Sequence, residues 1–203
     1  MKHLATGLPS DPRRDLGFTP TAIRFGLLGA SVFFLGTLAI YLIARTGQID
    51  AHVTSAQGLE RIRMPIWFWF STLMILVSSV SLWGTKKFVE NRDPRLARRA
   101  VVAAAALGWA FLLLQVPGIR ALFREHALMA DQRVFVYAVM AILFGLHAAH
   151  VLGGIVPLTA VAWSTRTRPL SSERLPVVRY LGWYWHYLAL VWIVIFNVLL
   201  LVG

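Results

Sequence analysis

Five stretches of the chain are apolar, carry no charged residue and are long enough to cross a lipid bilayer as helices. They run approximately over residues 25–44, 66–84, 100–116, 134–163 and 183–203. A hydrocarbon core about 30 Å thick needs roughly 20 apolar residues for each helical crossing. Hydrocarbon offers backbone groups no partners, and the alternating pattern of a membrane barrel is missing. The pattern therefore predicts an all-α fold, an integral membrane bundle of five transmembrane helices, preceded by a polar segment over residues 1–24.

Composition and charge agree with a membrane location and predict an orientation. The chain is 58% hydrophobic and 14% charged, with a mean hydropathy of +0.65, more apolar surface than a soluble domain of 203 residues can bury. Of the 20 Lys and Arg residues, 14 lie in the N-terminal segment and in the second and fourth loops, whereas 6 lie in the other loops. This bias predicts a multi-pass membrane protein with its N-terminus in the cytoplasm and its C-terminus outside. No apolar stretch precedes the first crossing, so we expect no cleaved signal peptide.

Several classes of function are disfavoured by what the sequence lacks. The net charge of +11 is scattered over every loop near helix ends, which suits lipid head groups better than nucleic acid. The absence of cysteine excludes disulfides, thiolate zinc sites, iron–sulfur clusters and c-type haem attachment. All acidic residues lie in loops, which argues against a transporter or pump. No catalytic, cofactor-binding or metal site is expected from the familiar motifs.

Polar residues inside the second and third crossings are candidate structural positions. Ser71 and Ser78 are seven residues apart, as are Thr72 and Ser79, so each pair returns to nearly the same side of a helix. Hydrogen bonding within or between helices is the favoured interpretation of this hydroxyl face, with a proton or water path as the alternative. Gln115 lies two residues before Pro117, where the third helix is expected to be interrupted, and its amide needs partners.

The last two crossings carry a small-residue stripe, histidines and aromatic residues. Ala141, Gly145, Ala149 and Gly153 recur every four residues, which predicts close approach of another helix. His147 and His150 share a sector of the same crossing, and His186 lies in an aromatic cluster of the last one. Histidines satisfied by hydrogen bonds are the favoured interpretation. A b-type haem held between His147 or His150 and His186 is the alternative.

Three sequence motifs in the second, fourth and fifth crossings match those of a known family. Residues 144–154 (FGLHAAHVLGG) look like that family's G-x-H-x-x-H-V-x-x-G, and residues 184–196 (YWHYLALVWIVIF) look like its Y-W-H-F-V-D-x-V-W-x-x-x-F. Pro65 with residues 71–79 (STLMILVSS) resembles its P-x-x-N-T-x-x-L-x-x-S-S helix. With these motifs the chain resembles subunit III of haem-copper respiratory oxidases in its five-helix bacterial form. The resemblance covers all five crossings in order, and it includes Tyr184, Trp185 and Trp192 among the motif positions.

The resemblance implies a non-catalytic subunit without a cofactor of its own. Such subunits pack against the catalytic subunit of a cytochrome c or quinol oxidase, hold phospholipids and support aerobic electron transport. The chain departs from the family at three positions where a carboxylate is usual, which are Ser31, Gly118 and Ala189. These departures weaken any role in proton uptake, and they leave an accessory protein of a nitric oxide reductase as an alternative.

Overall fold

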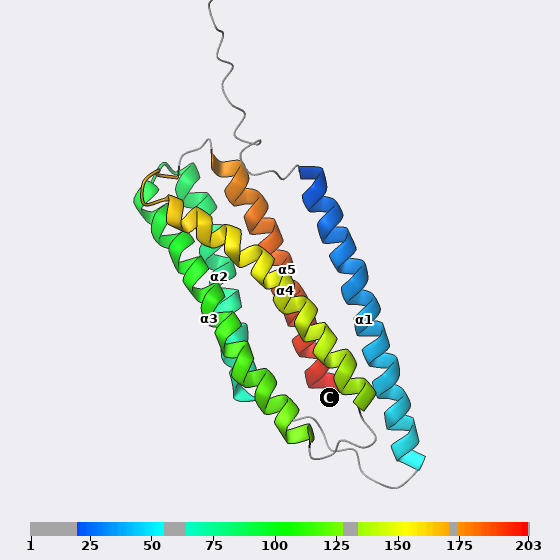
Figure 1. The fold of residues 1–203 in the computed structure, drawn as a ribbon. Helices are drawn as coiled ribbons and strands as arrows, with labels where there is room; N and C mark the ends of the chain where they lie inside the picture. Colours follow the sequence, from blue (N-terminus) through cyan, green and yellow to red (C-terminus); the bar gives the residue numbers. More distant parts are fainter. Residues whose placement is uncertain (1–19, 55–63, 128–133, 171–173, 203) are drawn as a thin grey trace, which may run out of the picture. The chain divides into compact units, whose positions relative to one another are not determined.

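The computed structural model describes residues 20–54, 64–127, 134–170 and 174–202. All regular secondary structure in these ranges is helical (Figure 1). The helices are α1 (Pro20–Thr54), α2 (Ile66–Glu90), α3 (Pro94–Ala127), α4 (Val134–Ser164) and α5 (Leu175–Val202). The predicted all-α class with five helices is thus confirmed.

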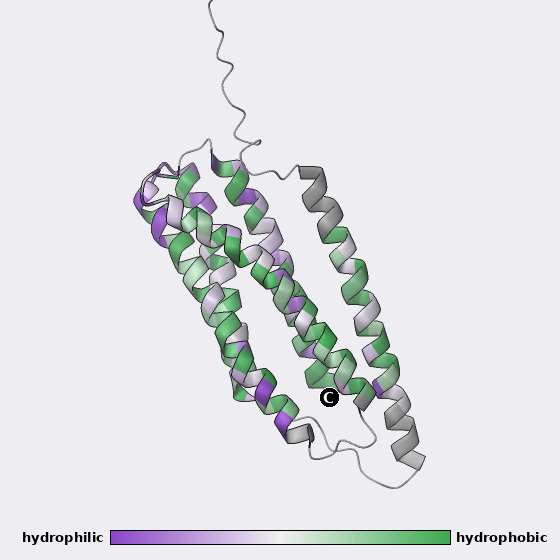
Figure 2. Cartoon of the chain, viewed as in Figure 1, coloured by the Kyte–Doolittle hydropathy of each residue, from purple (hydrophilic) through white to green (hydrophobic). Residues whose placement is uncertain are grey.

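Each of the five helices contains a segment long and apolar enough to span a membrane. Figure 2 shows the apolar residues running along the length of the helices, with hydrophilic residues concentrated at helix ends. The chain divides into two compact units, Met1–Gly36 and Thr37–Gly203. The first part of α1, up to Gly36, belongs to the first unit. The chain is a multi-pass membrane protein.

Four helices of the second unit form a closed ring of neighbours. Helix α2 packs against α3 and α5, and α4 packs against α3 and α5. Chain order and spatial order therefore agree, and consecutive helices run antiparallel through short connections (Figure 1). The most extensive of these contacts joins α2 to α3. Helices α2 and α3 both carry side chains that are almost fully buried. Examples are Phe68 and Ile75 on α2 and Phe111 on α3.

A tight connection joins α2 to α3 and accounts for their close pairing. The N–H of Asp93 donates to the Phe88 carbonyl at 2.9 Å, and the N–H of Arg92 donates to the Val89 carbonyl at 3.1 Å. This pair of bonds is a Schellman motif, which requires a left-handed residue that Arg92 supplies at φ 57°. Asp93 then caps α3, because its Oδ1 accepts from the N–H groups of Arg95 and Leu96. Pro94 occupies the first helical position, where its missing N–H costs nothing.

Helix α3 does not end near Pro117, as the sequence predicted, but continues to Ala127. A proline in a helix removes the N–H that would bond the carbonyl four residues earlier, here that of Leu113. Membrane helices tolerate this loss where neighbouring groups compensate. Gly118 follows directly, and a Cβ there would lie 2.8 Å from the Phe68 ring. The Pro117–Gly118 pair therefore does not end α3, and its glycine lets α3 pass close to α2.

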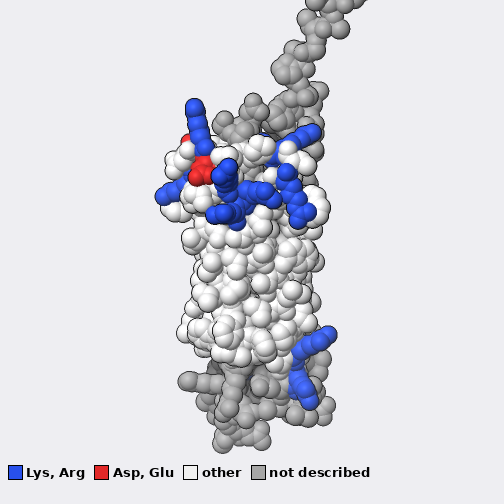
Figure 3. Space-filling view, turned by 90° about the vertical axis from the view of Figure 1, so that its left-hand side faces the viewer, with Lys and Arg blue, Asp and Glu red and all other residues white. Residues whose placement is uncertain are grey.

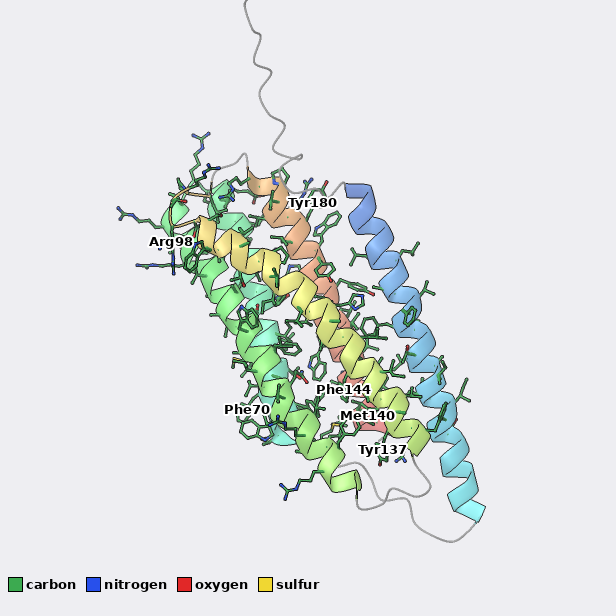
Figure 4. All side chains as sticks on the ribbon, in the orientation of Figure 1. Phe70, Arg98, Tyr137, Met140, Phe144 and Tyr180 are labelled. Atoms are coloured by element: carbon green, nitrogen blue, oxygen red, sulfur yellow. The ribbon has the colours of Figure 1, made fainter. Side chains whose placement is uncertain are left out.

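Charged side chains gather at the end of the bundle that holds the α2–α3 and α4–α5 connections (Figure 3). Arg98 projects away from the bundle there (Figure 4). The described basic residues at this end are Lys86, Lys87, Arg92, Arg95, Arg98, Arg99, Arg166, Arg168, Arg174 and Arg179. An apolar band separates them from Arg120 and Arg124 near the opposite end of α3.

The left-handed Arg92 makes the α2–α3 connection a target for stabilisation. A non-glycine residue in this conformation costs about 1–2 kcal/mol, whereas the extra freedom of glycine in the unfolded chain costs about 0.5–1 kcal/mol. Arg92→Gly should therefore raise the free energy of unfolding by about 0.5–1 kcal/mol. Thermal denaturation in detergent, followed by circular dichroism, measures the change.

Arg95→Gly is the matched control, because it removes the same side chain from the first turn of α3, where the backbone is helical. Glycine in a helix is unfavourable, so this variant should be less stable than the parent protein. An Arg92→Gly variant that loses as much stability as the control would contradict the argument.

Candidate functional site

Two sets of hydrogen bonds cross the bundle from α5 through α2 to α3. In the first, which we call the Ser78 layer, the indole Nε1–H of Trp185 donates to Ser78 Oγ at 3.0 Å. The Ser78 hydroxyl then donates to the Ala104 carbonyl of α3 at 2.7 Å. Ser78 is fully buried and Trp185 is 1% exposed. One serine thereby satisfies the indole N–H and joins three helices.

The second set, which we call the Ser71 layer, lies two helical turns away on α2. The Trp192 Nε1–H donates to Thr72 Oγ1 at 2.9 Å, and Gln115 Nε2 donates to Ser71 Oγ at 3.2 Å. Both hydroxyls donate to the same Phe68 carbonyl, at 2.7 Å from Thr72 and 3.0 Å from Ser71. This layer again connects α5, α2 and α3. Its two hydroxyl groups share one backbone acceptor.

Ser79 completes the polar face of α2. Its Oγ and the Nδ1 of His186 on α5 are hydrogen-bond partners. Together with the two layers, this contact means that Ser71, Thr72, Ser78 and Ser79 all have partners on a neighbouring helix. The hydrogen bonding between helices that was favoured for this face is therefore present. The seven-residue spacing on α2 matches Trp185 and Trp192, which are also seven residues apart on α5.

An aromatic cluster surrounds the Ser71 layer. Phe68 stacks on Phe144 at a ring-centroid distance of 5.7 Å, and the Trp192 ring lies 5.7 Å from that of Phe68. Phe144 and Met140 lie on the side of α4 that faces the interior of the bundle (Figure 4). His147 belongs to this cluster, because its ring centroid lies 5.5 Å from Trp192 and 6.1 Å from Phe111. The imidazole is 3% exposed and packs as part of the aromatic core.

The two remaining motif residues, His150 and Tyr184, pair α4 with α5. The Tyr184 hydroxyl donates to the His150 carbonyl at 2.9 Å. The His150 Nδ1 lies 2.7 Å from the Leu146 carbonyl, and since a carbonyl only accepts, Nδ1 carries the proton. A Cβ at Gly154 would lie 2.8 Å from the Tyr184 ring. The glycine therefore leaves room for the tyrosine to reach α4.

Among α2, α3 and α5, no helix makes the close contact with the small-residue stripe of α4 that its spacing predicted. Ala141, Gly145, Ala149 and Gly153 are all exposed. A Cβ at Gly145 would meet no atom within 4 Å, and one at Gly153 would meet only the Tyr184 hydroxyl at 3.5 Å. The close approaches occur instead at Gly154 and at Gly108, where a Cβ would lie 2.8 Å from the Trp185 ring. The stripe points outward because the buried face of α4 carries the larger side chains.

The contacts of His147 and His186 do not favour a haem held between these two side chains. His186 faces Ser79 on α2, whereas His147 lies between Phe111 of α3 and Trp192 of α5. These imidazoles therefore contact different helices. No group of three potential metal-ligating side chains occurs within the described part of the chain.

Comparison with known proteins identifies the family. No protein-family model matches the sequence. The chain is 37% identical over 176 residues to a probable quinol oxidase subunit 3 of Staphylococcus haemolyticus, covering 87% of this chain and 85% of that one. It is 26% identical over 205 residues to cytochrome c oxidase subunit 3 of Alkalihalophilus pseudofirmus, covering 97% and 94%. The chain belongs to the oxidase subunit 3 family.

This subunit 3 homologue has small residues at the three positions where a carboxylate is usual in the family. Ser31 donates to the Leu27 carbonyl of its own helix at 2.8 Å. Gly118 lies directly against the Phe68 ring, which leaves no room for a longer side chain. Ala189 is 4% exposed. The space that a carboxylate would need at Gly118 is thus filled by an aromatic ring of α2.

Several residues that shape the packing of α2, α3 and α4 could not be identified from the sequence. Phe111 and Gly108 have no distinguishing neighbours in the sequence, and Gly154 follows the more regular stripe by one position. The only signal that pointed to Gly154 was its place at the end of the histidine motif. Phe68 carries no signal of its own in the sequence, although its carbonyl accepts two hydroxyl groups and its ring is fully buried.

The glycine contacts predict which substitutions disturb the bundle. Gly108→Ala and Gly154→Ala should each lower the free energy of unfolding by about 1–3 kcal/mol, because the new methyl group overlaps a tryptophan or tyrosine ring. Gly145→Ala is the control, since its methyl group would meet open space. Equal melting temperatures for the three variants in detergent would show that the rings are not held against these glycines.

The Ser78 layer predicts a second stability difference. Ser78→Ala leaves both the Trp185 N–H and the Ala104 carbonyl without this partner, which should cost about 1–3 kcal/mol. Ser81→Ala is the matched control on the same helix, because Ser81 donates only to the Val77 carbonyl of its own turn. Denaturation of both variants, and of Ser78→Ala combined with Trp185→Phe, tests the coupling. Strictly additive effects of Ser78→Ala and Trp185→Phe would rule it out.

Proposed function

We propose that this chain is a non-catalytic accessory subunit of a respiratory haem-copper terminal oxidase. In this role it packs against the catalytic subunit in the bacterial inner membrane, contacts phospholipids and supports aerobic electron transport by stabilising the complex. The observation that carries the proposal is the similarity to proteins named subunit 3 of cytochrome c and quinol oxidases along nearly the whole chain.

The interior of the bundle supports a structural role. The buried polar groups of α2, α3 and α5 include serine and threonine hydroxyls, indole N–H groups and a glutamine, which bond mainly to one another and to backbone carbonyls. In α2 to α5 and their described connections, the acidic residues are Glu90 at the end of α2, Asp93 in the following turn and Glu125 in the last turn of α3. All three lie at or beyond the ends of the described apolar spans, so the interior of these spans can hold helices together but offers no carboxylate for proton transfer.

The charge distribution supports an orientation with the N-terminus in the cytoplasm. Basic side chains gather at the end that holds the α2–α3 and α4–α5 connections, which the positive-inside rule assigns to the cytoplasm (Figure 3). At the same end, Lys87 lies 3.7 Å from the Trp83 ring centroid and Arg166 lies 3.7 Å from that of Trp163. Pairs of this kind suit the head-group region, where an aromatic ring and a cation both contact phospholipid.

An accessory protein of a nitric oxide reductase is the second candidate, and the missing carboxylates favour it. Ser31, Gly118 and Ala189 occupy positions where the oxidase subunits that the motifs resemble usually carry acids. The packing of Phe68 on Gly118 makes this difference a part of the fold. Both candidates predict the same role beside a catalytic subunit, and they differ in the gas that the complex consumes.

Co-purification tests the proposal. An affinity-tagged chain extracted in mild detergent should bring a haem-containing catalytic subunit with it, and the purified complex should consume oxygen in the presence of an electron donor. Consumption of nitric oxide without oxygen uptake would favour the second candidate. Recovery of the tagged chain alone, while oxidase activity persists in the remaining membranes, would contradict both.

A further inference from the structure

The two layers differ in how completely their polar groups are satisfied. In the Ser78 layer the indole N–H, the serine hydroxyl and the Ala104 carbonyl form a continuous run of donors and acceptors. In the Ser71 layer the run ends at Gln115, whose Nε2 donates to Ser71. The Oε1 of the same amide is buried and accepts no hydrogen bond from any described residue. The side chain of Gln115 is 6% exposed.

A buried amide oxygen without a donor costs about 1–3 kcal/mol, so a native structure is expected to supply one. The neighbouring hydroxyl groups cannot supply it, because those of Ser71 and Thr72 both donate to the Phe68 carbonyl. The Trp192 N–H is also engaged, with Thr72. Exchanging the oxygen and nitrogen of the Gln115 amide leaves the same problem, since one end of the group would still be unsatisfied.

We propose that Gln115 and Ser71 bind a buried water molecule between α2 and α3. The water donates one hydrogen to Gln115 Oε1 and the other to the second lone pair of Ser71 Oγ, which accepts only from Gln115 among the described residues. Two polar partners are within the range that buried waters use. The ligand is water because the amide is too deeply buried for a larger donor.

The position of Gln115 near one end of the apolar span of α3 distinguishes this layer from the Ser78 layer. Gln115 lies five residues before Arg120, so it is about 7.5 Å along the helix from a charged residue near the end of the apolar span. Pro117 lies between them and gives no N–H to the Leu113 carbonyl. The Ser78 layer, deeper along α2 from this end, has no comparable unsatisfied group among the described residues.

Water-edited solid-state NMR on the full chain in phosphatidylcholine vesicles tests the proposal. The chain has four glutamines, and a Gln115→Leu variant identifies the Gln115 signals in a glutamine-labelled sample. A gadolinium chelate in the aqueous phase suppresses transfer from bulk water. The wild-type Gln115 side chain should still receive magnetisation from water protons, and its absence would overturn the proposal.

Matched serine variants test the second contact of the water. Ser71→Ala removes the hydroxyl that shares the water and should abolish or strongly weaken the transfer to Gln115. Ser81→Ala, on the same helix but bonded only to its own turn, should leave the transfer unchanged. A signal that survives Ser71→Ala at full strength would overturn the proposed position between the two side chains. The wild-type measurement decides the proposal by itself if the Ser71 variant does not fold.

Discussion

The bundle depends on one constraint, which is that polar groups inside hydrocarbon must find their partners within the protein. Helix α2 meets this constraint for three helices at once. Its hydroxyl face lies between the tryptophans of α5 and the backbone or amide groups of α3, so each layer closes through a serine or threonine. Apolar side chains surround these bonds but can equally contact lipid. The hydroxyl contacts therefore select which helices lie next to α2.

The sequence was sufficient for the number of helices and for the polar face of α2, because both depend on periodic patterns. The absence of charge over five spans predicts crossings, and a seven-residue repeat of hydroxyl groups predicts one face. The sequence did not predict which glycines lie in close helix contacts, and it did not predict that α3 continues through Pro117. A glycine matters where a ring from another helix lies over it, as Trp185 lies over Gly108. That information belongs to the neighbouring helix, so the regular spacing of Gly145 and Gly153 did not reveal the close contacts at Gly108 and Gly154.

The residues that carry the family resemblance are largely those that tie α5 to its neighbours. Trp185 and Trp192 bond to α2, His186 meets Ser79, and Tyr184 reaches the His150 carbonyl of α4. A motif rich in histidine and aromatic residues can suggest a cofactor site when it is read alone. Here the partners of each side chain show that the motif describes the packing of the last helix.

The different completeness of the two layers fits their different surroundings. The Ser78 layer combines an indole, a hydroxyl and a carbonyl of α3, and Gly108 brings α3 against the Trp185 ring beside it. The Ser71 layer instead uses a glutamine, which carries more donors and acceptors than one serine can match. Gln115 lies two residues before a proline that interrupts the hydrogen bonds of α3. The donors and acceptors of the Ser78 layer bond to one another and need no group from outside. In the Ser71 layer, the amide oxygen of Gln115 has no donor among the described residues. The polar groups of this bundle thus determine both its helix contacts and the place where the interior can accept a solvent molecule.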